Sequence, residues 1–148
     1  DFLTRVGGDE IRNGTMDEHN VNDLTRAISS GSAPCDGMVV VPCSAKSLSS
    51  IAHGSSSNLI ERTADVTLKE RRPLVLVVRE TPMNLIQLRN MVTVAEAGAA
   101  VVPAMPAFYQ KPVTFEDLGD FIAGRILGLL GLDHELFTRW TGGGGDGT

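Results

Sequence analysis

Three short apolar runs punctuate this chain, and amphipathic segments separate them. The runs occupy positions 37–41, 74–78 and 99–102 and are rich in valine, leucine and alanine. Short runs of this kind are typical of strands that are buried on both faces of a parallel sheet. Apolar residues at helical spacing predict helices over 59–71 and 84–97 and a third long helix nearer the C-terminus. The alternation predicts an α/β fold with a parallel sheet and right-handed crossovers.

The central run lies within the stretch KERRPLVLVVRETP, positions 69–82, which carries charges at both ends. Parallel sheets bind ligands outside the carboxyl ends of their strands. Arg79 and Glu80 directly follow the run, so we expect them at such a site. An arginine in that place predicts a bound anion.

A polar turn at positions 43–47 (CSAKS) follows the first run, whose strand we expect to end at Pro42. A strand, a small polar turn and a helix start together aim backbone N–H groups at an anion. A serine can also cap a helix without binding any ligand. Both interpretations stay open, and capping alone is the more common case.

The helix over 59–71, which Ser57 or Asn58 would cap, carries Arg62, Asp65 and Lys69 on nearly one face. If Asp65 paired with both cations, the three would form a surface ladder. The alternative is that this face looks at a bound phosphate. Spacing alone favours the ladder.

Other helices follow from similar patterns. Val21, Leu24 and Ile28 predict a short helix that ends near Ser30, and a last short helix is predicted over 132–140. The helix over 84–97 is expected to end at Gly98 and to bury one stripe of apolar residues, namely Leu85, Leu88, Val92 and Ala95.

The C-terminal helix carries a charge on its apolar face, and the loop before it carries two aromatic residues. Thr114 is the expected cap of that helix, and Arg125 falls on its apolar stripe, which runs from Phe115 to Leu129. A charge facing the core requires an internal carboxylate, a ligand anion or another subunit. Phe108 and Tyr109 lie in the proline-rich loop after the third run, where they pack on the core or stack on a ligand or a subunit.

Bulk properties narrow the classes of function. The 148 residues predict one domain over 1–140 and a glycine-rich flexible tail over 141–148. A net charge of -5 argues against nonspecific binding to nucleic acid or to an anionic membrane. No apolar run approaches the roughly 18 residues that a membrane span needs. Cys35 and Cys43 match neither a zinc nor a redox spacing, which favours a reduced, intracellular protein.

Four motifs together resemble the UbiX-type flavin prenyltransferases, over about positions 30–140. They read PCSAKSLSSIAHG, NLIERTADVTLKERRPLVLVVRETP, AEAGAAVVPAMPAFYQKP, and GRILGLLG with TRW. The resemblance implies a cytoplasmic flavoprotein with a Rossmann-like three-layer αβα sandwich and a mainly parallel sheet. It also implies a homo-oligomer of trimers packed into a dodecamer, with sites at subunit interfaces.

The resemblance further implies a reaction that needs no metal. Reduced FMN is alkylated by dimethylallyl monophosphate and closed into a fourth ring, which gives prenylated FMN. That product serves as the cofactor of a separate UbiD-type decarboxylase.

Residue roles carry over by position. The serine-rich flavin turn of the family matches Ser44, Ala45, Lys46 and Ser47, and the arginine that contacts flavin and phosphate matches Arg79. The clamp on the prenyl-donor phosphate matches Lys69, Arg79, Tyr109 and Arg125. Glu80 matches the neighbouring acid, so the implied catalytic residues are Glu80, Lys69 and Arg79. Arg62 matches a further arginine whose role stays open.

The sequence departs from the family pattern at its start. Family members begin with a strand and a Gly-Ala-Ser-Gly turn that grips the FMN phosphate, and neither precedes Asp1. The chain starts in mid-pattern, so we expect residues before Asp1 and a fold that lacks its first βαβ portion. The alternatives to an enzyme are a non-catalytic flavin-binding or decarboxylase-associated subunit, and a truncated homologue that serves only in assembly.

Overall fold

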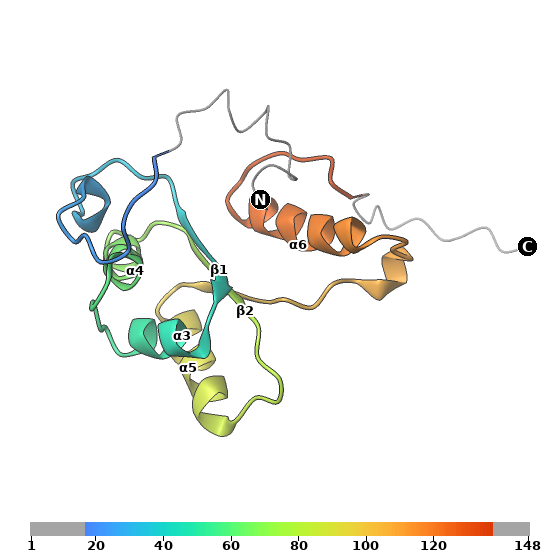
Figure 1. Ribbon diagram of the computed structural model, residues 1–148, viewed down its shortest axis with the longest axis horizontal. Coiled ribbons are helices and arrows are strands. Elements are labelled where there is room, and N and C mark those ends of the chain that lie inside the picture. Colours follow the sequence, from blue (N-terminus) through green and yellow to red (C-terminus); the bar gives the residue numbers. More distant parts are fainter. Residues whose placement is uncertain (1–16, 138–148) are drawn as a thin grey trace, which may run out of the picture.

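The computed structural model describes residues 17–137, which contain a three-stranded parallel sheet in the order β1-β2-β3 (Figure 1). The strands are β1 (Met38–Cys43), β2 (Leu74–Val78) and β3 (Ala100–Pro103). Val75 pairs with Val39 on one side and with Ala100 on the other. The predicted α/β fold with a parallel sheet is confirmed.

Helices lie on both sides of this sheet (Figure 1). Helices α3 (Ala45–Ala52), α4 (Leu59–Lys69) and α5 (Leu85–Glu96) share one side, as right-handed crossovers in a constant direction require. Helix α6 (Phe115–Leu129) lies on the other side. Two 3₁₀ turns, η1 (Ala27–Ser29) and η2 (Phe108–Gln110), complete the described elements. The result is the expected three-layer αβα arrangement.

The core is centred on β2, in which all five residues are buried. Leu48 and Ile51 of α3 and Val94 of α5 pack with the sheet in one apolar cluster. A central strand paired on both sides exposes neither edge nor face, which is why its sequence is apolar throughout.

Strand β1 extends past the expected end at Pro42. It runs on to Cys43, and its register with β2 shifts between Val40 and Cys43. Because Pro42 falls within this irregular part of the pairing, its missing N–H removes no regular ladder bond. The carboxyl end of β1 is therefore Cys43, whose side chain is fully buried.

Helix α5 buries a different face from the predicted one. Leu85 is 60% exposed and Val92 is 56% exposed, and the other two members of the predicted stripe, Leu88 and Ala95, are exposed as well. The buried residues are Asn90 and Val94, on the side that faces α3 and β3. Helical spacing shows which residues share a face, but packing decides which face is covered.

Two predicted short helices do not form in the described residues. In the first, the Asn20 and Asp23 side chains accept hydrogen bonds from the backbone N–H groups of Asn22 and Thr25. Such local bonds compete with helix formation, and only η1 remains. In the second, Gly131 (φ +76°) closes α6, and 132–137 contain no helix. Trp140 and the tail over 141–148 lie outside the described residues.

No helix within residues 17–137 has the length and apolar character needed to cross a bilayer.

Candidate functional site

The carboxyl ends of the parallel strands gather most of the predicted site residues at one edge of the sheet. Ser44 follows β1 and Arg79 follows β2, and these strands run parallel. After β3, the Ala104 N–H donates to the Val78 carbonyl at 2.9 Å, which ties the loop toward Tyr109 to the end of β2. The residues that follow the three strands therefore lie along one edge of the sheet.

The serine turn is a helix cap. Ser44 Oγ accepts a hydrogen bond from the Ser47 N–H at 3.1 Å, and the two hydroxyl oxygens lie 3.1 Å apart. The first N–H groups of a helix have no intrahelical partner. In α3 these include the N–H groups of Ala45 and Lys46, which lie at the edge where the strands end. The capping interpretation is confirmed, and anion binding by the same turn stays a prediction.

Arg79 and Glu80 differ in how they are held. The Arg79 side chain is exposed and has no hydrogen-bond or ion-pair partner within residues 17–137. Glu80 is half-buried, and its Oε1 accepts from the Thr81 N–H at 3.1 Å. The carboxylate is oriented by the turn that follows it, whereas the guanidinium is available to an anion.

Cys43 does not supply a nucleophile at this edge. Burial raises the pKa of its thiol to about 11, so the reactive thiolate is scarce at neutral pH.

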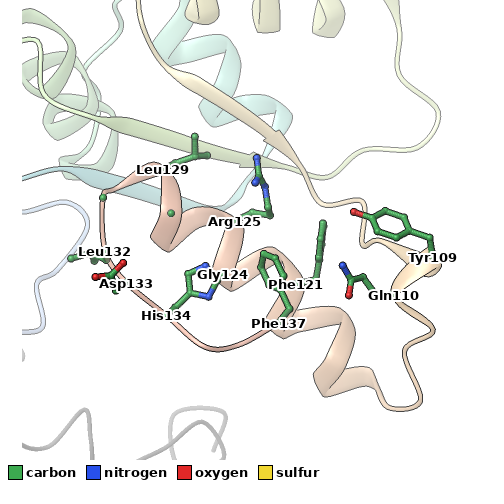
Figure 2. Close-up of a pocket in the computed structure, with 12 residues that line it drawn as sticks. Tyr109, Gln110, Phe121, Gly124, Arg125, Leu129, Leu132, Asp133, His134 and Phe137 are labelled. Carbon is green, nitrogen blue, oxygen red and sulfur yellow. The ribbon is translucent and has the colours of Figure 1, made fainter. Parts of the chain in front are cut away.

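Tyr109 and Arg125 line one open pocket of about 620 Å³ between η2, α6 and the segment 131–137. Figure 2 shows the Tyr109 hydroxyl pointing toward the side of α6 that carries Arg125. Arg125 is exposed, and no described residue pairs with it. Among the three predicted partners for this charge, no internal carboxylate is found within residues 17–137, and a ligand anion and another subunit stay predictions.

The floor of this pocket was missed by sequence reasoning. The Phe121 and Phe137 rings lie 5.1 Å apart, and His134 and Phe137 are also 5.1 Å apart. A Cβ on Gly124 would lie 2.5 Å from the Phe137 ring and 2.6 Å from the His134 ring, so only glycine allows this approach. The spacing of Gly124 and Gly128 was the available signal, because two glycines four apart leave one bare patch on a helix.

The expected apolar stripe of α6 is only partly buried. Leu118, Ile122 and Ile126 are half-buried, whereas Phe115 is 89% exposed. The predicted cap at Thr114 is confirmed, with Asp117 completing a capping box.

Lys69 lies at the opposite edge of the sheet from Arg79. It is the last residue of α4 and precedes β2, whereas Arg79 follows β2. The five residues of β2 separate the two edges by about 17 Å, at about 3.3 Å per residue. One chain therefore does not bring Lys69 to Arg79, Tyr109 or Arg125.

The predicted ladder on α4 is half correct. Asp65 pairs with Arg62 at 2.8 Å, but Lys69 pairs with Glu70 at 2.9 Å. Arg62 also donates from Nε to the Ser29 carbonyl at 3.1 Å. Arg62 thus fixes the segment before β1 onto α4, and its role in the family's site stays open.

Known proteins share these features. The flavoprotein family profile matches residues 9–127. The chain is 54% identical over 127 residues to the flavin prenyltransferase UbiX of Halalkalibacterium halodurans, covering 86% of this chain and 62% of that relative. It is 47% identical over 131 residues to the flavin prenyltransferase UbiX of Methanocaldococcus jannaschii, covering 88% of this chain and 71% of that relative.

Solved structures agree with the sequence relatives. AnUbiX (PadA1), in complex with FMN and dimethylallyl pyrophosphate, matches with a TM-score of 0.82 at 55% identity, over 85% of this chain and 67% of that one. A dodecameric FMN-dependent UbiX-like decarboxylase from Escherichia coli O157:H7 matches with a TM-score of 0.81 at 48% identity, over 84% of this chain and 67% of that one. The chain therefore belongs to the flavoprotein family, in its UbiX-type flavin prenyltransferase branch.

Proposed function

We propose that the protein is a flavin prenyltransferase, which joins the dimethylallyl group of dimethylallyl monophosphate to reduced FMN and so makes prenylated FMN. The observation that carries the proposal is the pocket in which Tyr109 and Arg125 face a common space without a described partner for Arg125. An open pocket that joins a phenol and an unpaired guanidinium suits a phosphate. The relative AnUbiX, at 55% identity, is described in complex with FMN and dimethylallyl pyrophosphate.

The carboxyl edge of the sheet fits a flavin. The start of a helix there is formed by Ser44, Ala45, Lys46 and Ser47. Arg79, which has no partner among residues 17–137, adds a cation at the same edge. Backbone N–H groups at a helix start together with an arginine are the donor set that a phosphate or a flavin oxygen requires. When bound, reduced FMN supplies the nucleophile, and the protein supplies position and charge.

The roles of the side chains follow from the charge that develops on the donor. Cleavage of an allylic C–O bond leaves negative charge on the departing phosphate. That charge is offset by the cations Arg79, Arg125 and Lys69. Tyr109 donates a hydrogen bond to the phosphate from its hydroxyl group. Glu80, oriented by the Thr81 N–H, would take up the proton that reduced FMN releases on alkylation and pass it to the departing phosphate. This set of groups stabilises the leaving group without a metal.

Assembly supplies what one chain lacks. Lys69 cannot reach its own Arg79 across β2, so we infer a homo-oligomer in which the Lys69 of one copy enters the site of the next. A dodecameric relative supports this inference. We place this protein in the range from trimer to dodecamer, with its product passed to a UbiD-type decarboxylase.

The test is anaerobic incubation of the natural full-length protein with reduced FMN and dimethylallyl monophosphate, followed by mass spectrometry. We expect an adduct one C5H8 unit heavier than FMN, and a parallel reaction with the pyrophosphate identifies the preferred donor. FMN binding without any adduct would instead establish the second candidate, a non-catalytic flavin-binding or decarboxylase-associated subunit.

A mixing experiment tests the shared site. Lys69→Ala and Arg79→Ala are each expected to be inactive, and co-assembled oligomers of the two regain activity because some sites receive both native residues. Mixtures that stay inactive while forming mixed oligomers would contradict a site shared between copies.

A further inference from the structure

The amino-terminal edge of the sheet holds the head of Lys69 in a defined place. Lys69 Nζ lies 2.9 Å from Glu70 Oε1, although both side chains are partly exposed, at 51% and 36%. Adjacent positions on a regular helix do not face each other. The pair forms here because Glu70 is the C-cap residue of α4, where the helical geometry ends.

Gly31 provides the space in which this pair sits. A Cβ on Gly31 would overlap Glu70 Oε1 and would lie 3.0 Å from Lys69 Nζ. The segment that contains Gly31 is fixed by two guanidinium groups: Arg72 Nη2 donates to the Gly31 carbonyl at 2.8 Å, and Arg62 Nε donates to the Ser29 carbonyl at 3.1 Å. The glycine is therefore held against the ion pair.

We propose that Glu70, seated against Gly31, is a positioning residue that presents the Lys69 ammonium to the prenyl-donor phosphate of a neighbouring copy. The proposal rests on the proposed function, in which Lys69 contacts that phosphate. A free lysine side chain populates many rotamers, and a partner at its head restricts them before the phosphate arrives. The hydrogen bond and the charge of Lys69 lower the pKa of Glu70 below its ordinary value, so the carboxylate is ionised at neutral pH.

Glu70→Gln in the natural full-length protein tests the proposal. We expect the KM for dimethylallyl monophosphate to rise about two- to fivefold, which is the range of exposed ion pairs, with kcat and FMN affinity nearly unchanged. Gly31→Ala is expected to act in the same way, since its methyl group would displace the pair. Asp65→Asn is the matched control, because it breaks a 2.8 Å ion pair on the same helix without touching Lys69.

A double-mutant cycle separates positioning from a structural role. The Lys69→Ala variant is expected to be inactive, so the cycle measures the dissociation constant of dimethylallyl monophosphate. In that background Glu70→Gln is expected to have no further effect on this constant, because the residue that it positions is gone. An increase in the dissociation constant as large as the one in the native background would overturn the proposal, as would an unchanged KM in the single variant. A fall in KM would also overturn it, since Glu70 would then compete with the phosphate for Lys69. The proposed function fails separately, if the wild-type protein makes no prenyl adduct.

Discussion

The cations at the two edges of the sheet differ in their hydrogen-bond and ion-pair partners. At the amino-terminal edge, Lys69 pairs with Glu70, and Arg72 donates to the Gly31 carbonyl. At the carboxyl edge, the Arg79 guanidinium has no partner among residues 17–137. Arg125, which lines the pocket with Tyr109, likewise has no partner among these residues.

We interpret the difference as one between cations that stabilise the fold and cations that are proposed to bind a ligand. An unpaired charge alone does not mark a site, since Arg71 at the amino-terminal edge is also exposed without a partner among residues 17–137. A charged group that is already hydrogen-bonded in the chain is a poor starting point for a binding site, because a ligand must first replace its partner. Unpartnered guanidinium groups at the carboxyl ends of parallel strands have no such cost. Lys69 is the exception, since it is paired with Glu70 and yet proposed to bind phosphate. The proposals that the site is shared between copies and that Glu70 positions Lys69 explain this exception.

The largest expected effect is that of Arg79→Ala, which removes the unpaired cation from the carboxyl edge. Prenyl-FMN formation is expected to fall at least about 100-fold, in line with the loss of one preorganised charge at a developing anion. FMN affinity should fall as well, since Arg79 is assigned to both ligands. Arg89→Ala, at an exposed position on α5, is the control and should retain activity. Near-wild-type activity of Arg79→Ala would remove the basis of the comparison between the edges.

Arg125→Ala should act on the donor alone. The loss of a charged hydrogen bond, about 1.5–3 kcal/mol, predicts that the KM for dimethylallyl monophosphate rises about 10- to 100-fold, while FMN affinity stays within about twofold. Steady-state kinetics and a flavin titration measure the two quantities. An equal loss of both would show that Arg125 is misassigned.

Glu61→Gln tests the opposite class, a buried charge with partners in the chain: its Oε2 is held by Ser57, whereas its buried Oε1 has no partner among the described residues. Glu61 is 1% exposed, and its Oε2 accepts from the Ser57 N–H at 2.9 Å and from the Ser57 hydroxyl at 2.6 Å. We expect the free energy of unfolding to fall by about 1–3 kcal/mol, with the KM values unchanged. A large effect on the KM with no loss of stability would contradict this assignment.

The pH dependence of stability gives a second measurement on Glu61. The Ser57 hydroxyl bond, followed by backbone and further side-chain bonds, lowers the pKa of Glu61 below its ordinary value of 4.5. A carboxyl group with a lowered folded-state pKa stabilises the fold above its unfolded-state pKa and loses that contribution as the pH falls. The wild-type advantage over Glu61→Gln should therefore be complete near pH 6 and shrink below about pH 4.5 in denaturant titrations.

Ser44→Ala has the smallest expected effect and separates the cap from the flavin site. Loss of the cap on α3 should cost about 1 kcal/mol of stability, measured by chemical denaturation. Ser44→Asp keeps a capping oxygen but adds a negative charge, so it should retain stability and weaken FMN binding. Unchanged FMN affinity in Ser44→Asp would mean that the turn caps a helix and binds no flavin anion.

The local elements could be predicted well from the sequence. The run 74–78 predicted a fully buried strand, and β2 has those bounds. Asn58, one of two predicted caps, accepts from the Glu61 N–H, and Thr114 caps α6 as expected. These features depend on contacts within three or four residues, so the pattern of the chain contains nearly all the information that decides them.

The burial of α5 and the partners of Lys69 could not be predicted in this way. Leu85 and Val92 share a helical face as expected, yet that face is exposed, because Asn90 and Val94 face α3 and the sheet. The spacing of Lys69 and Asp65 allowed an ion pair, but the end of α4 and the space beside Gly31 favoured Glu70.

The sequence by itself thus determined the strands, the caps and the family to which the chain belongs, because each rests on residues that are near neighbours or on a matching order of motifs. Only the tertiary structure decided which cations have partners among residues 17–137. Asp65 pairs with Arg62 and not with Lys69, and Tyr109 and Arg125 face one pocket. Sequence spacing places several possible partners within reach of each charge, and only the positions of the side chains in the folded chain select among them.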